Sequence, residues 1–519
     1  MQIAQTLRRS ALLHPDRTAL VEGEVRLDWR SFEARVARLA GGLRSLGLAP
    51  GDRVAMLAHN SRRYVEFFYA TLWAGGIAVP VNTRWADAEI RHALDDSGAR
   101  ILVADAAHAE MADAQHAAGA ALDHRVLAED AGIERGGWQH WERLADAEAV
   151  ADAGRGYDDV ACLFYTGGTT GRSKGVMLTH ANIIANSLTA MLNMDIRADT
   201  VHLHVSPMFH VAGGARLFSV TLAGGTHVVL PRFEVDAFLD AIERERVTLT
   251  IIVPTMLNRL VHHPDLEARD LSSLRLLSYG ASPMPEALLR AAMERLPGVR
   301  FLQSYGMTEL SPVVTVLPPE FHVFEGPNAG YTASAGRPVY NADVMIVGEN
   351  GTPCATGEIG EICVRGPMVM KGYWNQPELT AEALRGGYMH TGDAGYLDAR
   401  GFLFIVDRIK DMIVSGGENV YSAEVEDAIY LHPDVAECAV IGIPSETWGE
   451  AVHAVVVPRA GRTLEAEQVI EHCRARIAHF KCPRSVEVRA EELPKSGPGK
   501  ILKTELRKPW WAGQGRGVN

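Results

Sequence analysis

The chain has 519 residues, a formal net charge of −13 and 47% hydrophobic residues. At about 150 residues per domain, this length predicts roughly three domain-sized units. The hydrophobic fraction excludes a chain that is disordered throughout, and the net acidity argues against a general nucleic-acid-binding protein. Glycine is over-represented, with 49 residues, or about 9% against a usual value near 7%.

Processing and redox signals narrow the protein class. None of the six cysteines forms a C-x-x-C pair, which argues against a zinc ribbon or a dithiol redox site. The first 20 residues lack the pattern of a signal peptide, and no apolar run reaches the roughly 18 residues that a membrane span needs. We therefore expect a cytoplasmic protein without a transmembrane segment.

Along the chain, short β-rich runs alternate with longer segments of helical periodicity, which predicts βαβ units and mainly parallel sheets. The expected strands cover residues 53–58, 101–104, 160–165, 226–230, 249–253 and 274–278. The expected helices include residues 31–46, 64–75 and 235–244.

The pattern changes twice towards the C-terminus. Residues 342–406 show short alternating strands with Gly and Pro turns, typical of a small β-rich subdomain. A compact pattern follows residue 410. The predicted fold is α/β: a large N-terminal body of stacked α/β sheets (residues 1–409) that includes the subdomain, then a small, mobile α+β C-terminal lobe (residues 410–519).

The C-terminal lobe carries a basic stretch. Residues 474–508 contain ten Lys and Arg against four acidic residues. The stretch is either a solvated edge or a surface that faces a polyphosphate.

The most informative segment follows the strand at 160–165 and reads Tyr-Thr-Gly-Gly-Thr-Thr-Gly-Arg-Ser-Lys-Gly over residues 165–175. Glycines let the backbone approach a ligand closely, and N–H and hydroxyl groups can donate to phosphate oxygens. A Walker P-loop requires G-x-x-x-x-G-K-[ST]; here Ser173 precedes Lys174 and Gly175 follows it, so that pattern fails. The segment instead resembles the signature of the adenylate-forming superfamily, which includes acyl-CoA synthetases, firefly luciferase and the adenylation domains of peptide synthetases. Ser173 replaces the usual proline.

Further segments resemble other motifs of this superfamily, in the same order. They are Pro207-Met-Phe-His-Val-Ala-Gly213, Tyr279-Gly-Ala-Ser282, Gln303-Ser-Tyr-Gly-Met-Thr-Glu309, Tyr388-Met-His-Thr-Gly-Asp393, Asp407-Arg-Ile-Lys-Asp411 and Pro494-Lys-Ser-Gly-Pro-Gly-Lys-Ile-Leu-Lys503. The resemblance covers nearly the whole chain and implies an acyl-CoA synthetase that joins a carboxylic acid to AMP, releases pyrophosphate, and transfers the acyl group to CoA.

The resemblance also implies the residues that bind ATP. Thr308 would contact the α-phosphate, and Glu309 would bind Mg²⁺, a hard cation that favours carboxylate and phosphate oxygens. Asp393, assisted by Arg408, would bind the ribose hydroxyls, and Tyr305 would stack on adenine; core packing is the competing interpretation of Tyr305 and Ile405. The complete set of ATP- and AMP-binding candidates is Thr166, Gly167, Gly168, Thr169, Thr170, Gly171, Lys174, Gly280, Ala281, Gln303, Ser304, Tyr305, Asp393, Ile405 and Arg408.

Five further roles follow from the resemblance. Lys500 would bridge the acid carboxylate and the α-phosphate as the leading catalytic residue, and Lys410 would be the hinge about which the lobe turns between the two half-reactions. His210 would stand near the acyl carboxylate. The CoA tunnel would include Ser415, Gly416, Gly417 and Glu418, and the acyl pocket His210, Val211, Gly214, Gly306 and Met307.

The acid is the least determined part of this interpretation. Small apolar linings admit a medium or long acyl chain or a flat aryl ring, and we favour a fatty acid over an aryl acid such as benzoate, cinnamate or ferulate. A stand-alone enzyme that loads a carrier protein remains an alternative, and intact motif residues argue against a non-catalytic binder. The expected partners are the acid, ATP and CoA, with homodimer formation left open.

Overall fold

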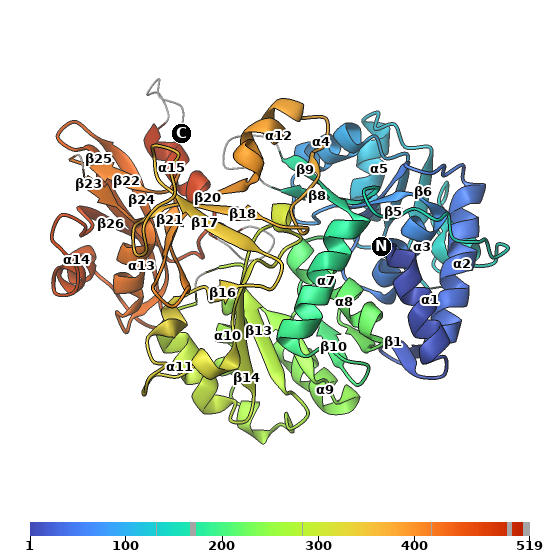
Figure 1. The fold of residues 1–519 in the computed structure, drawn as a ribbon, viewed down its shortest axis with the longest axis horizontal. Coiled ribbons are helices and arrows are strands. Elements are labelled where there is room, and N and C mark those ends of the chain that lie inside the picture. The colour runs from blue at the N-terminus through green and yellow to red at the C-terminus, as the bar shows by residue number, and fades with distance from the viewer. Residues whose placement is uncertain (131, 167–172, 283, 417, 496–500, 512–519) are drawn as a thin grey trace.

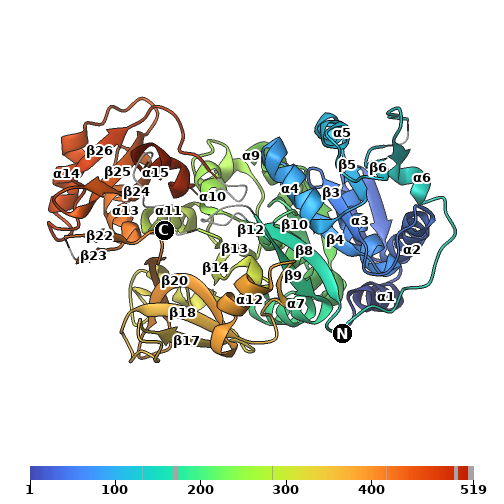
Figure 2. The same cartoon turned by 90° about the horizontal axis from the view of Figure 1, so that it is seen from above.

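The computed structural model describes residues 1–130, 132–166, 173–282, 284–416, 418–495 and 501–511. In these residues the chain forms two large sheets and two smaller ones (Figure 1). The large sheets and their helices make up most of the molecule, and the two smaller sheets lie together at one end of it (Figure 2). No helix in the described residues is long and apolar enough to cross a membrane.

The nine-stranded sheet has the order β16-β15-β14-β13-β12-β10-β11-β1-β2. From β14 to β1 every neighbouring pair is parallel, and the outer pairs are antiparallel. Its strands are β1 (Thr18–Glu22), β2 (Val25–Asp28), β10 (Val201–His204), β11 (Thr226–Val229), β12 (Leu249–Ile252), β13 (Leu276–Gly280), β14 (Arg300–Tyr305), β15 (Thr315–Leu317) and β16 (Arg337–Pro338).

The eight-stranded sheet has the order β19-β9-β8-β4-β3-β5-β6-β7 and is parallel from β8 to β7. Its strands are β3 (Arg53–Leu57), β4 (Ile77–Pro80), β5 (Ile101–Ala104), β6 (His124–Leu127), β7 (Gln139–His140), β8 (Val160–Thr166), β9 (Lys174–Thr179) and β19 (Gly372–Tyr373). The six strands expected from the sequence all appear, with ends shifted by at most two residues.

Helices cover both large sheets. They are α1 (Ile3–Leu13), α2 (Trp29–Ser45), α3 (Arg62–Ala74), α4 (Asp87–Ser97), α5 (Ala109–Ala117), α6 (Trp141–Leu144), α7 (His180–Met194), α8 (Val211–Ala223), α9 (Val235–Glu245), α10 (Pro254–Val261) and α11 (Glu286–Arg295). Helix α3 is buried along its entire length; Ser61 caps its first turn, and Gly75 ends it at φ 93°. One hydrophobic cluster joins α1, α2, α3 and α8 to both sheets, so these sheets form one body.

The third sheet is antiparallel and contains β17 (Asp343–Val347), β18 (Gly360–Arg365), β20 (Met389–Leu397) and β21 (Leu403–Arg408), with α12 (Pro377–Ala383) nearby. Strands β20 and β21 alternate buried and less buried positions only in part.

The C-terminal lobe has its own sheet and its own hydrophobic core. It contains β22 (Ile413–Ser415), β23 (Glu418–Val420), β24 (Val435–Ser445), β25 (Gly449–Pro458), β26 (Ser485–Val488), α13 (Ser422–Tyr430), α14 (Ala466–Arg474) and α15 (Lys503–Trp511). Short 3₁₀ turns complete the described structure at Leu266–Ala268, Thr308–Leu310, Pro319–Phe321, Tyr331–Ala333 and Arg385–Gly387. The fold is therefore mixed α/β with a smaller C-terminal domain, as the sequence predicts.

Candidate functional site

Three of the residues expected to bind the nucleotide lie in one hydrogen-bonded group. Asp393 and Arg408 are opposite each other on the antiparallel strands β20 and β21, and Arg408 Nε lies 2.7 Å from Asp393 Oδ1. Tyr305, at the end of β14, donates its hydroxyl to Asp393 Oδ2 at 2.6 Å. Burial and the neighbouring Asp393 carboxylate raise the pKa of Tyr305 well above its usual value, so it stays a hydrogen-bond donor.

Glu309 lies in a second group, where Tyr373 of β19 donates its hydroxyl to Glu309 Oε1 at 2.9 Å. The Lys174 Nζ lies 5.0 Å from the centroid of the Tyr373 ring. Burial raises the pKa of the Glu309 carboxyl, while the Tyr373 hydrogen bond and the charges of Arg408 and Lys174 oppose that shift. Sequence analysis did not single out Tyr373, because a lone aromatic residue in a Gly-Tyr-Trp turn is ordinary core material.

The donor set near Glu309 fits a magnesium ion bound together with ATP. Mg²⁺ in nucleotide sites is held by one or two carboxylates, with phosphates and water completing its coordination. Glu309 is 5% exposed, and a buried carboxylate is stabilised by a nearby cation. Thr308 directly precedes it at the start of the 3₁₀ turn Thr308–Leu310.

The small residues near the adenine segment are required by the backbone itself. A Cβ on Gly280 would lie 2.3 Å from the Ser304 carbonyl oxygen on the neighbouring strand, and one on Gly306 would lie 1.7 Å from the Pro312 carbonyl oxygen. Ala281 has a positive φ of 68°. Gln303 accepts a long hydrogen bond from the Tyr279 hydroxyl at 3.5 Å. Close backbone packing therefore accounts for these two glycines without a ligand.

Ile405 lies two residue pairs along the β20–β21 ladder from the Asp393–Arg408 pair. It is opposite Gly395 in the β20–β21 register and is 37% exposed. Its side chain is therefore not part of the packed core and remains accessible to a ligand, whereas Tyr305 is half-buried against the main hydrophobic cluster.

The expected acyl segment surrounds the N-terminus of α8, where His210 is the capping residue. His210 Nε2 is buried and has no hydrogen-bond partner among the described residues. Burial, with a smaller effect from Arg84, lowers the pKa of His210 to about 3, so its imidazole is neutral near pH 7. A Cβ on Gly214 would lie 2.8 Å from the Met208 carbonyl oxygen, so this glycine lets α8 pack against its own entry loop. Val211 is buried and Met307 is half-buried.

In the C-terminal lobe, Ser415 is buried and its Oγ has no partner within the described residues. Gly416 has φ +62°, and a Cβ there would lie 2.7 Å from the Trp448 ring. Arg484 stacks on the same ring at 4.2 Å, while Glu418 is exposed. The expected tunnel segment thus lies against an aromatic residue that the sequence did not reveal.

A hydrogen bond joins the expected hinge segment at Lys410 to helix α15. Lys410 is exposed, and its carbonyl oxygen accepts a hydrogen bond from Arg507 Nη1 at 3.1 Å. Arg507 also pairs with Asp411 at 3.0 Å. On the other side of the hinge, Asp407 Oδ2 accepts from the backbone N and the hydroxyl of Ser422 in α13.

Most cations of the basic stretch at 474–508 are already paired with acidic side chains. Seven of its cations form ion pairs inside the lobe: Arg474, Lys481, Arg489, Lys495, Lys503, Arg507 and Lys508. Lys503 Nζ lies 2.7 Å from Glu426 Oε1, and its side chain is 14% exposed. Five of these cations pair with acids outside the stretch, namely Glu467, Glu424, Glu437, Glu426 and Asp411, so part of its local charge excess is offset within the lobe. The polyphosphate-facing surface stays a prediction.

Some of the expected residues lie outside the described part of the chain, namely Gly167, Gly168, Thr169, Thr170, Gly171, Gly417 and Lys500. The residues that flank the glycine-rich segment are described. Thr166 and Lys174 are opposite each other at the end of the antiparallel pair β8–β9.

Comparison with known protein families shows to which family this chain belongs. Residues 7–374 match the model for AMP-binding enzymes, and residues 424–500 match that for the C-terminal domain of AMP-binding enzymes. The chain belongs to the AMP-binding enzyme family. It is an AMP-forming acid–thiol ligase of the adenylate-forming superfamily, and it uses ATP and CoA.

Similarity to individual members of the AMP-binding enzyme family extends over almost the whole chain. A feruloyl-CoA synthase from an Amycolatopsis species is 44% identical to this chain, and the aligned region spans 96% of this chain and 97% of the synthase. A long-chain-fatty-acid–CoA ligase from Mycobacterium tuberculosis is 36% identical over 98% of this chain and 99% of its own. The structure of o-succinylbenzoate-CoA synthetase from Bacillus subtilis, in complex with its acyl-adenylate intermediate, is 32% identical with a TM-score of 0.85, and covers 96% of this chain and 97% of its own.

Proposed function

We propose that this ligase activates an aromatic carboxylic acid and transfers the aryl-acyl group to CoA. The observation that carries this proposal is the 44% identity to a feruloyl-CoA synthase over nearly the full length of both chains. Our sequence analysis favoured a fatty acid and kept an aryl acid as the alternative. The lower identity of 36% to a fatty-acid–CoA ligase shifts the preference to the aryl acid and keeps the fatty acid as the second candidate.

In the proposed mechanism, the Asp393 carboxylate binds the ribose hydroxyls, and Arg408 and Tyr305 hold it in position through the bonds at 2.7 and 2.6 Å. A carboxylate that accepts two strong hydrogen bonds has a fixed orientation and still offers lone pairs to a ligand. We assign adenine to the space next to Tyr305, Gly280 and Ala281.

The chemical step joins two anions, so cations and hydrogen-bond donors must offset the charge that develops at the α-phosphate. We assign this role to Lys500 and Thr308, and assign the β- and γ-phosphates to Thr166, Lys174 and the segment between them. Glu309 would hold Mg²⁺, which neutralises phosphate charge when it is bound. Because Tyr373 binds one oxygen of Glu309, it would orient this carboxylate towards the ion.

His210 would close the acid side of the site as a neutral group. With its pKa near 3 it adds no positive charge near pH 7, so it acts through shape and hydrogen bonding. We place the hinge at Lys410, between a body of residues 1–409 and a lobe of residues 410–519. Rotation there would exchange the Lys500 segment for the Ser415–Glu418 turn, which would line the CoA tunnel.

A panel of acids tests the proposal. Purified enzyme is given ATP, Mg²⁺, CoA and, in turn, cinnamate, 4-hydroxycinnamate, benzoate, decanoate and palmitate, and AMP release is measured with and without CoA. We expect the highest kcat/KM for an aryl acid, with AMP and CoA-thioester formed in equal amounts. A higher kcat/KM for decanoate or palmitate would overturn the aryl assignment in favour of the fatty acid. AMP release without CoA consumption would instead favour carrier loading.

A further inference from the structure

Arg216 is a buried cation without an acidic partner in the described chain. It lies in α8, is 2% exposed, and its Nη1 donates to the Met194 sulfur at 3.8 Å. Its Nε has no partner within the described residues. Burial lowers the pKa of Arg216 to about 10, and the guanidinium still carries its charge at neutral pH. Buried charges in proteins are normally paired, so this one indicates a missing partner.

A second polar group without a partner lies beside it. His202 Nδ1 is buried, and no described residue bonds to it. Burial, together with the charges of His227 and Arg216, lowers the pKa of His202 to about 3, so the ring is neutral. The neighbouring histidines differ: His204 Nε2 lies 2.9 Å from His227 Nδ1, and His227 Nε2 lies 3.0 Å from Thr221 Oγ1. Only some of this polar cluster is therefore satisfied internally.

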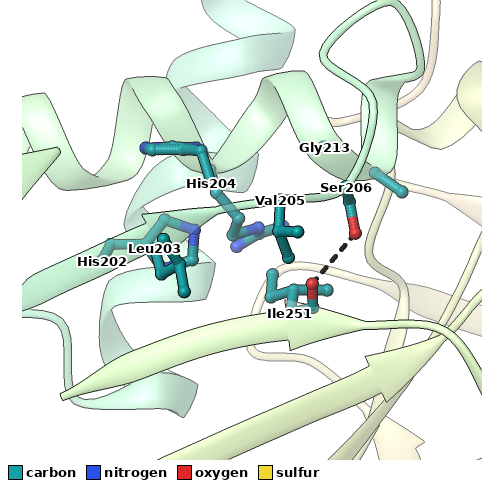
Figure 3. A pocket seen from close by; sticks show the side chains of 9 residues that line it. His202, Leu203, His204, Val205, Ser206, Gly213 and Ile251 are labelled. Atoms are coloured by element: carbon teal, nitrogen blue, oxygen red, sulfur yellow. Dashed lines mark hydrogen bonds between the residues drawn. The ribbon is translucent and has the colours of Figure 1, made fainter. Parts of the chain in front are cut away.

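Arg216 and His202 line one cavity. Figure 3 shows His202 at this cavity together with Ser206, Gly213 and Ile251. Ser206, Gly213 and Ile251 line it too, and Ser206 donates its hydroxyl to the Ile251 carbonyl at 2.9 Å, which occupies that donor. The cavity volume is about 10 Å³, which is close to the space that one water molecule or one hydroxyl group needs. The cavity therefore fits a single small polar group.

The topology puts this cavity on the acid side of the site. Strand β10 runs towards the carboxyl edge of the sheet, the loop at 205–210 turns there, and α8 runs back. His210 caps α8 at this edge, and Arg216 lies six residues further along, which corresponds to a rise of about 9 Å. Ala212 and Gly213 lie one turn before Arg216, so they share its face of the helix. The separation of His210 and Arg216 suits an aromatic ring with a short side chain.

We propose that Arg216 and His202 form the distal end of the acid pocket and bind the hydroxyl group of a hydroxylated aromatic acid. This inference rests on the proposed function and names its substrate class. A hydroxyl oxygen accepts from Arg216 Nε and can also donate to, or accept from, His202 Nδ1, so it complements either imidazole tautomer. A carboxylate only accepts and needs more room. An alkyl chain would leave both groups buried and unbonded, which selects against it.

The test measures the ratio of kcat/KM for 4-hydroxycinnamate to that for cinnamate. We expect wild-type enzyme to prefer 4-hydroxycinnamate, and Arg216→Met to lower the ratio by about 10- to 100-fold, as expected for the loss of a charge-assisted hydrogen bond. Arg216→Lys should retain part of the preference because it keeps a donor and a charge. The matched control is Arg246→Met, which removes an exposed arginine that pairs with Asp270 and should leave the ratio unchanged.

The wild-type measurement tests the inference even if Arg216→Met fails to fold. A preference for 4-hydroxycinnamate over both cinnamate and 4-methoxycinnamate supports it, because the methoxy group is larger and cannot donate. Equal kcat/KM for the three acids would mean that the cavity holds only a water molecule, and would overturn it. An unchanged ratio in folded Arg216→Met would also overturn it while leaving aryl-CoA ligase activity intact. Failure of wild type to use any aryl acid would overturn both proposals.

Discussion

At the nucleotide end of the candidate site, Asp393 bonds to both Tyr305 and Arg408. At the acid end, Arg216 is buried beside a methionine sulfur, and His202 and His210 each have one ring nitrogen without a partner in the described residues. Both ends contain buried polar groups. At the nucleotide end these groups bond to each other, whereas at the acid end each keeps a polar atom that has no bonding partner among the described residues and is free to bond to a substrate.

This difference is understandable from the chemistry of the two substrates. ATP is the same for every enzyme of the family, so the residues that bind it can be fixed in advance by hydrogen bonds among themselves. The acid differs between members, and selectivity requires groups that remain unsatisfied until the correct substrate arrives. Unpartnered groups are therefore a better guide to the acid than the small residues, whose presence the packing of the backbone already explains.

The largest effect is expected from Lys500→Ala, which removes the charge assigned to the α-phosphate. Loss of a group that acts mainly in the transition state costs about 1000-fold in kcat, so acid-dependent pyrophosphate release should fall by that factor. Thioester formation from supplied acyl-AMP should remain near the wild-type rate. Lys508→Ala, which removes an exposed lysine paired with Glu505, is the control. Equal loss of both half-reactions in Lys500→Ala would contradict the assignment.

Removing the Glu309 carboxylate tests the proposed magnesium site. Glu309→Gln keeps the shape but loses the charge, and we expect about a 100-fold loss of adenylation rate that high Mg²⁺ restores in part. Tyr373→Phe should act in the same direction but by about 10-fold, because it only orients the carboxylate. Initial adenylation rates of both variants are measured at increasing Mg²⁺ concentrations, on the order of 1, 10 and 50 mM. Full activity of Glu309→Gln would refute the role.

The hinge prediction compares the two half-reactions directly. Lys410→Pro should restrict the backbone at the turning point, so adenylation and thioesterification should be depressed unequally, by about 10-fold relative to each other. Rapid-quench measurement of each half-reaction checks this. Equal losses in the two half-reactions would count against a hinge at Lys410. The control is Arg462→Met, which removes an exposed ion pair of the lobe and should slow neither half-reaction.

The contrast between the two ends is sharpened by comparing Asp393→Asn with Arg216→Met. Asp393→Asn should raise the KM for ATP by about 10-fold, since one charge-assisted bond is lost, and leave the ratio between acids unchanged. Arg216→Met should change that ratio and leave the KM for ATP unchanged. Steady-state kinetics with ATP and acid varied separately will show whether the effects separate. A common change in both parameters would mean that the ends are not independent.

The nucleotide end could be predicted from sequence because its residues sit in short motifs with fixed spacing. Asp393 and Arg408 stand opposite each other simply because a hairpin joins their strands, and the motif order already indicated the family. The glycine-rich segment was recognisable for the same reason. The fold class also followed, since buried strands and amphipathic helices alternate along the chain.

The acid end and the lobe surface could not be predicted because they depend on long-range pairing. Arg216 carries no local signal: an arginine in a helix is usually exposed, and only the fold reveals that no acid among the described residues pairs with it. Lys503 shows the opposite case, because it looked free in a basic stretch and is in fact paired with Glu426, 77 positions earlier in the chain. Tyr373 gains its meaning only from its contact with Glu309.

The last expected effect concerns the stability of the fold in acid and comes from the histidines of the acid end. Burial lowers the pKa of His202, His210 and His227 to about 3, and it lowers the pKa of His204 as well. Below the usual histidine pKa of 6.5, the unfolded chain binds protons that the folded chain does not, so the free energy of unfolding should fall as the pH drops from about 6.5 towards 3. Each such histidine contributes up to about 1.4 kcal/mol per pH unit within this window.

Thermal unfolding from pH 7.5 to 4.5 measures this effect. His202→Gln keeps a neutral polar side chain that cannot titrate, so its melting temperature should fall less steeply with acidification than that of wild type, even if its stability at pH 7.5 is lower. His262→Gln is the control, because the His262 side chain is exposed and lies outside this buried cluster. An identical slope for His202→Gln and wild type would mean that His202 binds its proton over the same pH range in the folded chain as in the unfolded chain, so that Arg216 would face a second cation in acid instead of a neutral acceptor. Such a result would weaken the assignment of a hydroxyl at this end, so the acid profile tests the same comparison through stability instead of through catalysis.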